Sequence, residues 1–275
     1  MNLESTFFLA SAEGPIARLS LNRPEKANGM VPDFWSELPR LVREIDANPG
    51  IRALVISGEG RHFTGGMDLS SFNDIAKLIA GEPARAALAL RKLVLDLQAT
   101  FNALEDARIP VIAAVHGACV GAGVDMIGAC DIRIASADAF FAIEEVNIGM
   151  AADVGTLQRL PKLIAPGIVK ELAYTGRRFS ATEAKAWGLV NSVHSDRQAA
   201  ISAALDLARE IAAKSPVAIA GIKKAVDFAR DHTVRDGLDQ IATWNAAMLR
   251  PQDMMAALQA KIAKKQAVFD DLLAG

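Results

Sequence analysis

The first fifty residues show a strand pattern followed by a helical one. Phe7–Ala10 and Ile16–Leu21 flank a turn at Glu13-Gly14-Pro15 and predict a β-hairpin, because apolar and polar residues alternate along the second segment. From Pro32 the apolar residues recur at helical spacing until Asn48-Pro49-Gly50 ends the pattern. Pro39 lies inside this predicted helix and is expected to kink it.

Two nearly continuous apolar runs, Ile51–Ser57 and Val111–Val115, are typical of strands buried on both faces. A stretch rich in Ala and Leu, from about Pro83 to Glu105, lies between them and predicts a helix. Short strands are predicted further along the chain, at Ile132–Ala135, Ala139–Ala142 and Val190–Val193.

Helix signals dominate the last third of the chain. Ser180-Ala-Thr-Glu183 is a capping box, and Gly188 stands where the helix that it begins should stop. From Arg197 onward the pattern is helical throughout. The chain is therefore predicted to have an α/β core at residues 1–196 and a C-terminal helical region at residues 197–275.

The charge balance does not indicate a protein that binds nucleic acid or a membrane surface. Lys and Arg number 30 and Asp and Glu number 32, a net charge of −2, whereas nucleic-acid-binding and membrane-surface proteins usually carry a basic excess. The run Ile109–Cys130 is almost long enough to span a bilayer, but its glycines and Asp125 favour a buried strand, a loop and a buried helix. We expect no membrane partner, and a cytoplasmic location or an organelle matrix in a eukaryotic host.

Familiar cofactor and nucleophile motifs are missing from the sequence. Gly121-Ala-Gly123 opens like a dinucleotide fingerprint, but Met126 replaces its third glycine, and neither a phosphate-binding P-loop nor a Gly-x-Ser-x-Gly elbow occurs. The four histidines lack the spacing of a metal site. The sequence therefore offers none of these common motifs as a guide to its chemistry.

Two glycine-rich loops, Gly58–Leu69 and His116–Asp125, each follow a predicted buried strand. Glycine lets a backbone approach a ligand closely, and the helix expected after the second loop would point free N–H groups at that ligand. One N–H from each loop could form an oxyanion hole around a carbonyl oxygen. The alternative is that both loops are merely tight turns between a strand and a helix.

Four acids follow or lie within these loops. Asp125 falls in the first turns of the predicted helix, where it could compensate the helix dipole. Glu144 and Glu145 are adjacent, so on extended chain one of them should point away from the site. Asp153 lies in an apolar loop, either as the N-cap of a helix at Thr156–Leu160 or as a catalytic group with a raised pKa.

The ordered motifs resemble those of the crotonase (enoyl-CoA hydratase/isomerase) superfamily over about residues 15–193. The resemblance implies a spiral of ββα repeats and a C-terminal trimerisation region that gives a homotrimer or homohexamer. It also implies an acyl-CoA thioester substrate and no metal or redox cofactor. It implies oxyanion donors at the N–H groups of Met67 and Ala122, although the family usually has glycine at the second position. The motifs that carry the resemblance are Asn22-Arg-Pro-Glu-Lys-Ala-Asn28, His62-Phe-Thr-Gly-Gly-Met-Asp-Leu69, Ile109–Gly117, Gly121-Ala-Gly123, Cys130-Asp-Ile132 and Thr156–Leu160. The residues that it places near coenzyme A are Arg23, Lys26, Ala27, Gly65, Gly66, Asp68 and Leu69.

The acids at positions 125, 145 and 153 resemble those of the subgroup that converts 3,5-dienoyl-CoA to 2,4-dienoyl-CoA, in which all three positions are acidic. This resemblance implies Glu145 as the base at C2, Asp153 as the acid at C6 and Asp125 as a tuning group, with the first two roles open to exchange. A 2-enoyl-CoA hydratase, with Asp125 and Glu145 holding water, is the alternative enzyme. A catalytically idle acyl-CoA-binding protein is the alternative outside enzymes, and three retained acids disfavour it.

Overall fold

In the computed structural model, which describes residues 2–274, the strands form two sheets. The larger sheet has the strand order β1-β2-β3-β4-β6-β9, and the smaller sheet has the order β5-β7-β8. The strands are β1 (Phe8–Glu13), β2 (Ile16–Leu21), β3 (Ala53–Gly58), β4 (Val111–Val115), β5 (Ala118–Val120), β6 (Ile132–Ser136), β7 (Phe140–Ala142), β8 (Phe179–Ser180) and β9 (Ser192–His194).

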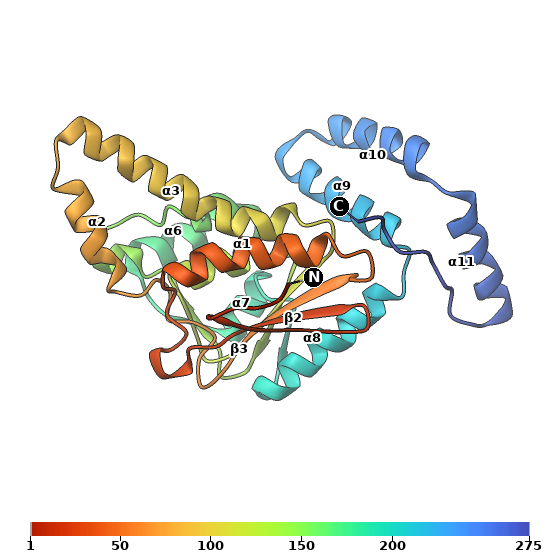
Figure 1. Cartoon of the computed structure of the whole chain (residues 1–275), viewed down its shortest axis with the longest axis horizontal. Helices are drawn as coiled ribbons and strands as arrows, with labels where there is room; N and C mark the ends of the chain where they lie inside the picture. The colour runs from red at the N-terminus through yellow and green to blue at the C-terminus, as the bar shows by residue number, and fades with distance from the viewer. Residues whose placement is uncertain (1, 275) are drawn as a thin grey trace.

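Helices cover the sheets and extend beyond them on both sides (Figure 1). Two short 3₁₀ helices, η1 (Pro24–Lys26) and η2 (Glu145–Ile148), lie in loops. The α-helices are α1 (Pro32–Asp46), α2 (Ser71–Ile79), α3 (Pro83–Asp106), α4 (Ala122–Gly128), α5 (Thr156–Leu163), α6 (Pro166–Thr175), α7 (Ala181–Trp187), α8 (Arg197–Ala212), α9 (Pro216–Asp231), α10 (Val234–Met248) and α11 (Pro251–Ala263).

The central strands β3 and β4 of the larger sheet are buried on both faces, as their continuous apolar runs predict. Side chains alternate along β3, so that Leu54 and Ile56 face the main core while Ala53 and Val55 pack beneath α8. The predicted hairpin is confirmed, with β1 antiparallel to β2. The other neighbours in this sheet, β2-β3, β3-β4, β4-β6 and β6-β9, pair in parallel. The α/β class predicted from the sequence is therefore correct.

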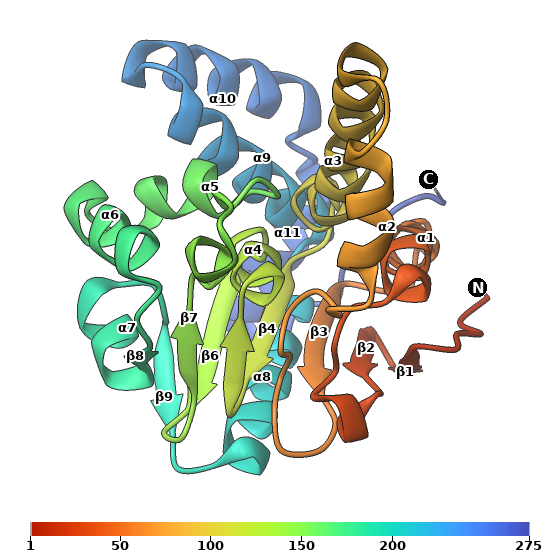
Figure 2. The ribbon, with the colours of Figure 1, turned by 90° about the vertical axis from the view of Figure 1, so that its left-hand side faces the viewer.

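The chain advances as a spiral. After β4 joins the larger sheet, β5 joins the smaller one, and α4 follows; β6 and β7 then repeat the same alternation (Figure 2). The predicted spiral of strand–strand–helix units is thus confirmed. Its consequence is that the loops after β3 and β5 lie next to each other, because β3 and β4 are neighbours in the sheet.

Helix α1 continues through Pro39. Proline has no N–H, so the carbonyl of Trp35, four residues earlier, lacks its helical partner. Thr100 on α3 donates its hydroxyl to this carbonyl at 3.2 Å. The proline is therefore accommodated by a contact between two helices.

The helices after β9 divide into two parts. Helix α8 packs against the sheet through Ala200, Ile201 and Ala204, so it belongs structurally to the core although it lies beyond residue 196. Helices α9, α10 and α11 extend away from the strands (Figure 1). We call these three helices, residues 216–263, the helical arm. The interface role predicted for residues 197–275 stays a prediction.

The helical arm is attached to the core at both ends. Lys223 on α9 is buried and forms an ion pair of 3.0 Å with Asp131, beside hydrogen bonds to two backbone carbonyls of the core. Beyond α11, the carboxylate of Asp271 and the carbonyl of Phe269 accept hydrogen bonds of 2.7 Å from Arg52. Among residues 2–274, no helix has the length and apolar character required to cross a membrane.

Candidate active site

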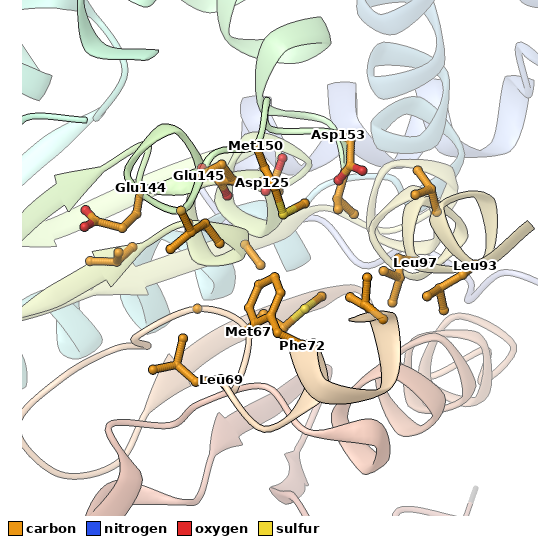
Figure 3. Close-up of a pocket in the computed structure, with 18 of the residues that line it drawn as sticks. Met67, Leu69, Phe72, Leu93, Leu97, Asp125, Glu144, Glu145, Met150 and Asp153 are labelled. Atoms are coloured by element: carbon orange, nitrogen blue, oxygen red, sulfur yellow. The ribbon is translucent and has the colours of Figure 1, made fainter. Parts of the chain in front are cut away.

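A pocket of about 130 Å³ lies between the two glycine loops, helices α2 and α3, and the segment from Glu144 to Val154 (Figure 3). Its walls are mostly apolar, and four acidic residues, Asp125, Glu144, Glu145 and Asp153, lie along one side of it (Figure 3). The predicted residues that it brings together are Gly65, Gly66, Met67, Leu69, Ala122, Asp125, Glu145 and Asp153.

The first glycine loop places Met67 with its N–H free. Met30 donates its N–H to Gly66 and accepts the N–H of Asp68, at 2.8 and 3.0 Å, which is the pattern of a parallel bridge. In such a bridge the intervening residue directs its own N–H to the opposite side. The N–H of Met67 accordingly has no acceptor among the described residues, and Met67 lines the pocket.

The second glycine loop approaches the first so closely that no side chain fits between them. A Cβ atom on Gly66 would lie 2.7 Å from the carbonyl oxygen of Val120 and 3.5 Å from the nitrogen of Ala122. Gly121 precedes α4 with φ at 54°, a left-handed value that favours glycine. Ala122 opens α4, and its N–H also lacks an acceptor within the part of the chain that the structure describes.

Asp125 lies on α4 and is buried. Its Oδ1 accepts the N–H of Thr156, the first residue of α5, at 2.5 Å. Burial raises the pKa of Asp125 to about 6, although the hydrogen bonding with Thr156 acts in the opposite direction. Helix α5 is preceded by Gly155, which makes no side-chain cap, so the N-cap alternative for Asp153 is wrong.

Glu145 begins the 3₁₀ helix η2. The expectation that Glu144 and Glu145 lie on extended chain is therefore wrong, and the tighter turn lets both line the pocket. Oε2 of Glu145 is buried without a hydrogen-bond partner, and a methyl group on Gly121 would lie 3.3 Å from its Oε1. Burial raises the pKa of Glu145 to about 7, and repulsion from Asp125 adds to the effect.

Asp153 lies further along the pocket, on the side of Leu93 and Leu97 (Figure 3). Its carbonyl accepts a hydrogen bond of 2.7 Å from Gln98 of α3, which fixes the loop without occupying the carboxyl group. Burial raises the pKa of Asp153 as well. Carboxyl groups that repel one another in a low-dielectric pocket do not all ionise together, so the pocket retains a proton near neutral pH.

The remaining predicted residues do not line the pocket. Arg23 forms an ion pair of 2.5 Å with Asp68, which holds the pKa of Asp68 well below its usual range. Ala27 accepts the N–H of Gly65 at 2.7 Å, and Lys26 is exposed beside it. Arg23 and Ala27 thus contact the first glycine loop, in which Leu69 is exposed.

The sequence interpretation missed the pocket wall that α2 and α3 provide. Four apolar residues of α3 recur at intervals of three and four and face the cavity, together with Phe72 and Ile75 of α2. The helical spacing was a usable signal, but spacing alone does not tell a core face from a ligand wall. The α3 residues are Leu90, Leu93, Val94 and Leu97. Nowhere in residues 2–274 are three or more His, Cys, Asp or Glu side chains grouped so that they could hold a metal ion.

Comparison with known proteins agrees with this arrangement. The model of the family described as enoyl-CoA hydratase/isomerase matches residues 11–271. A protein of Rattus norvegicus named mitochondrial Delta(3,5)-Delta(2,4)-dienoyl-CoA isomerase is 46% identical over 259 residues, 94% of this chain and 79% of the relative. A protein of Arabidopsis thaliana with the same activity in its name, described as peroxisomal, is 40% identical over 95% of both chains.

Solved structures show the same fold. The crystal structure of an enoyl-CoA hydratase from Bacillus anthracis superposes with a TM-score of 0.86, at 30% sequence identity. The superposition covers 96% of this chain and 99% of the other.

Proposed function

The chain belongs to the enoyl-CoA hydratase/isomerase family, and on that premise we propose that it converts 3,5-dienoyl-CoA thioesters to 2,4-dienoyl-CoA thioesters. The observation that carries this proposal is the third acid. Asp153 lies in the same pocket as Asp125 and Glu145, displaced along it toward α3. A proton shift between two distant carbon atoms needs acid and base groups at two positions.

The thioester oxygen is placed between the N–H groups of Met67 and Ala122. Both lack an acceptor among the described residues, and hydrogen bonds of Thr64 with Ala118 and Val120 hold the two loops close together. An oxygen at this point would receive two hydrogen bonds that strengthen as negative charge develops, and removing one such donor typically costs about 2.7–4 kcal/mol of transition-state stabilisation.

Glu145 is the base at C2. Its carboxyl group lies next to Gly121, and hence next to the carbonyl carbon that Ala122 would hold. A pKa near 7 suits a group that must be ionised to accept a proton and protonated to release it. When Glu145 removes the C2 proton, the electron pair spreads from C2 over the two conjugated double bonds and the thioester oxygen.

Asp153 is the acid at C6. Protonation there draws the electrons of the extended enolate into new double bonds at C2–C3 and C4–C5, and restores the thioester carbonyl. The raised pKa of Asp153 favours the neutral form that this step requires. The cycle leaves Glu145 protonated and Asp153 ionised, and proton transfer to and from solvent resets both. Asp125 tunes the pair by repulsion and fixes α5 through Thr156.

Coenzyme A is proposed to lie over the surface formed by Arg23, Lys26, Ala27 and the loop Gly65–Leu69. Lys26 is exposed there and free to approach a phosphate, whereas Arg23 is engaged with Asp68 and supports the loop. The reaction moves one proton and no electrons between molecules, so we propose that it uses no cofactor beyond the coenzyme A of its substrate.

The hydratase alternative has less support. A hydratase needs two acids that hold one water, and Asp125 is tied to the N–H of Thr156, which leaves it less free for that task. The most similar relatives reported above are named isomerases, while the hydratase from Bacillus anthracis shares only 30% of its residues.

A direct assay tests the proposed function. Purified 3,5-dienoyl-CoA should gain the absorbance of the thioester-conjugated 2,4-diene when the protein is added, without incorporation of water. If 2-enoyl-CoA were hydrated rapidly while 3,5-dienoyl-CoA remained unchanged, the hydratase would replace the isomerase.

We further propose that the chain assembles as a homotrimer or homohexamer through the helical arm. Large apolar side chains on the arm are exposed, which supports an interface there. The two named relatives are described as mitochondrial and peroxisomal. For this chain the compartment stays a prediction, the cytoplasm or an organelle matrix in a eukaryotic host.

A further inference from the structure

Asn28 is fully buried between the turn at η1 and α1, and it does not line the pocket. Its φ is 52°, and the φ of the preceding Ala27 is 49°. Left-handed backbone costs most residues about 1–2 kcal/mol, with Asn among those that tolerate it best. The conformation turns the Asn28 side chain toward the first glycine loop.

The side-chain amide of Asn28 binds that loop at several points. Its Nδ2 lies 2.9 Å from the carbonyl oxygen of Glu59, 2.8 Å from that of His62 and 3.1 Å from that of Phe63. Its Oδ1 accepts the N–H of Arg23 at 2.8 Å. Only a side chain with both donors and an acceptor can make this set, so an aspartate could not replace it.

The backbone of Asn28 extends the same connection toward Met67. Thr64 donates its hydroxyl to the carbonyl of Asn28 at 2.9 Å and accepts the N–H of Gly66 at 3.1 Å. Two residues after Asn28, Met30 forms the bridge that turns the N–H of Met67 away from it and toward the pocket. The position of that N–H therefore depends on Asn28.

We infer that Asn28 is a positioning residue for the reaction, which orients the N–H of Met67 toward the thioester oxygen without touching the substrate. The inference rests on the oxyanion hole proposed above. It also connects two functions of one segment, because the turn that carries Arg23 and Lys26 for coenzyme A is held to the oxyanion loop by the same amide.

The test measures polarisation of the bound thioester rather than activity alone. Hexanoyl-CoA labelled with ¹³C at the carbonyl cannot isomerise, and its infrared C=O stretch should move to lower wavenumber when the wild-type protein binds it. Asn28→Gly keeps the left-handed backbone and removes every side-chain contact. We expect it to lose at least half of that shift and about 10²-fold in kcat, with little change in KM.

Two further variants separate positioning from loss of stability. Thr64→Val removes the neighbouring hydrogen bond with almost no change of shape, and it should lose part of the shift even if Asn28→Gly does not fold. Lys223→Met breaks a buried ion pair at the base of the helical arm, so it should lower stability and leave the shift intact.

The outcomes distinguish the inference from the function on which it rests. An unshifted carbonyl in the wild-type complex would overturn the oxyanion hole itself. A normal wild-type shift that persists in folded Asn28→Gly would overturn only the role of Asn28. If Asn28→Gly does not fold, a shift that is undiminished in Thr64→Val would overturn that role.

Discussion

Buried carboxyl groups in the pocket have opposite effects on chemistry and on stability. Burial raises the pKa of Glu145 from 4.5 to about 7, which suits a base and makes its ionised form unfavourable in the fold. A carboxyl group whose pKa is raised by folding binds its proton more tightly in the folded state. Its destabilising effect is therefore absent below pH 4.5 and complete above about pH 7.

Glu145→Gln should consequently stabilise the protein at pH 8 while abolishing activity. One pKa unit corresponds to 1.36 kcal/mol, so the gain in the free energy of unfolding is at most about 3 kcal/mol. At pH 4 the variant and the wild type should unfold at the same denaturant concentration. Glu144→Gln, beside it and less enclosed, is the control and should change stability by less than about 0.5 kcal/mol at either pH. If the wild type and Glu145→Gln were equally stable at pH 8, burial could not be the cause of the raised pKa of Glu145.

Asp153→Asn should separate the two proton transfers. Without the acid at C6, isomerisation should fall by about 10²–10⁴-fold, the usual contribution of a general acid. Exchange of the C2 proton with deuterated solvent should survive better, because Glu145 and the two N–H groups remain. Mass spectrometry of recovered 3,5-dienoyl-CoA measures the exchange, and absorbance measures the product.

The other two acids provide the comparison for Asp153→Asn. Glu145→Gln should stop both exchange and isomerisation, whereas Asp125→Asn should be milder because an amide oxygen can still accept the N–H of Thr156. If Asp153→Asn left isomerisation intact and the other two variants destroyed hydration of 2-enoyl-CoA, the isomerase assignment would fail.

For single residues, the sequence predicted which side chains belong to the site better than it predicted their hydrogen-bond partners. Motif resemblance placed Asp125, Glu145 and Asp153 in one site, and the structure brings them into one pocket. The partner of Asp125 was not predictable, because Thr156 is 31 residues away and only the packing of α4 against α5 brings them together. The hydrogen bonds of Asn28 escaped prediction for the same reason.

Among the elements, the two glycine loops act as one unit because Thr64 of the first is hydrogen-bonded to Ala118 and Val120 of the second. Gly66 has φ at 88° and no room for a methyl group, since a Cβ atom would lie 2.7 Å from Val120 O. Gly66→Ala should push the loops apart and separate the two N–H groups. We expect a loss of about 10²-fold or more in kcat, comparable to the loss of one oxyanion donor.

Gly188 offers a matched control for this substitution. It ends α7 with φ at 87°, almost the value at Gly66, and a methyl group there would meet nothing within 4 Å. Gly188→Ala should lose the same conformational stability, about 1–2 kcal/mol, without loss of kcat in the folded protein. Equal kcat values for the two variants, measured under conditions where both are folded, would contradict the role of the loop contact.

Sequence patterns predicted the helices that carry a proline or a capping box at their start, and missed some of the shorter elements. Helices α1 and α3 begin at the prolines that the sequence indicated, and the capping box at Ser180 is present. Helix α2 has apolar residues at helical spacing but buries none of them in the core, because Phe72 and Ile75 face the pocket instead. The 3₁₀ helix at Glu145 is a single turn of four residues, which is too short for a periodicity to show.

For the whole molecule, the helical arm carries more exposed apolar surface than a lone chain of this size needs. The side chain of Leu238 on α10 is 64% exposed, and Ile222, Val226 and Leu258 on the other arm helices are similarly open. We expect a trimer or a dimer of trimers by light scattering at micromolar concentration. A monomer would refute this prediction.

Leu238→Glu should weaken the assembly, because a charge would enter the apolar contact. Leu9→Glu is the matched control, since Leu9 is also exposed, at 53%, but lies on β1 away from the arm. It should leave the scattering mass unchanged. Dissociation by Leu9→Glu and not by Leu238→Glu would move the interface to the N-terminal hairpin.

The attachment of the helical arm at both ends has a consequence for how subunits would meet. Lys223 anchors the first helix of the arm to Asp131, and Arg52 anchors the segment beyond α11 through Asp271. The arm is therefore fixed to the core at both ends. An arm anchored at both ends presents its apolar face in one orientation before another subunit binds. Association then costs little conformational entropy, so subunits should bind faster and more specifically than they would through a flexible extension.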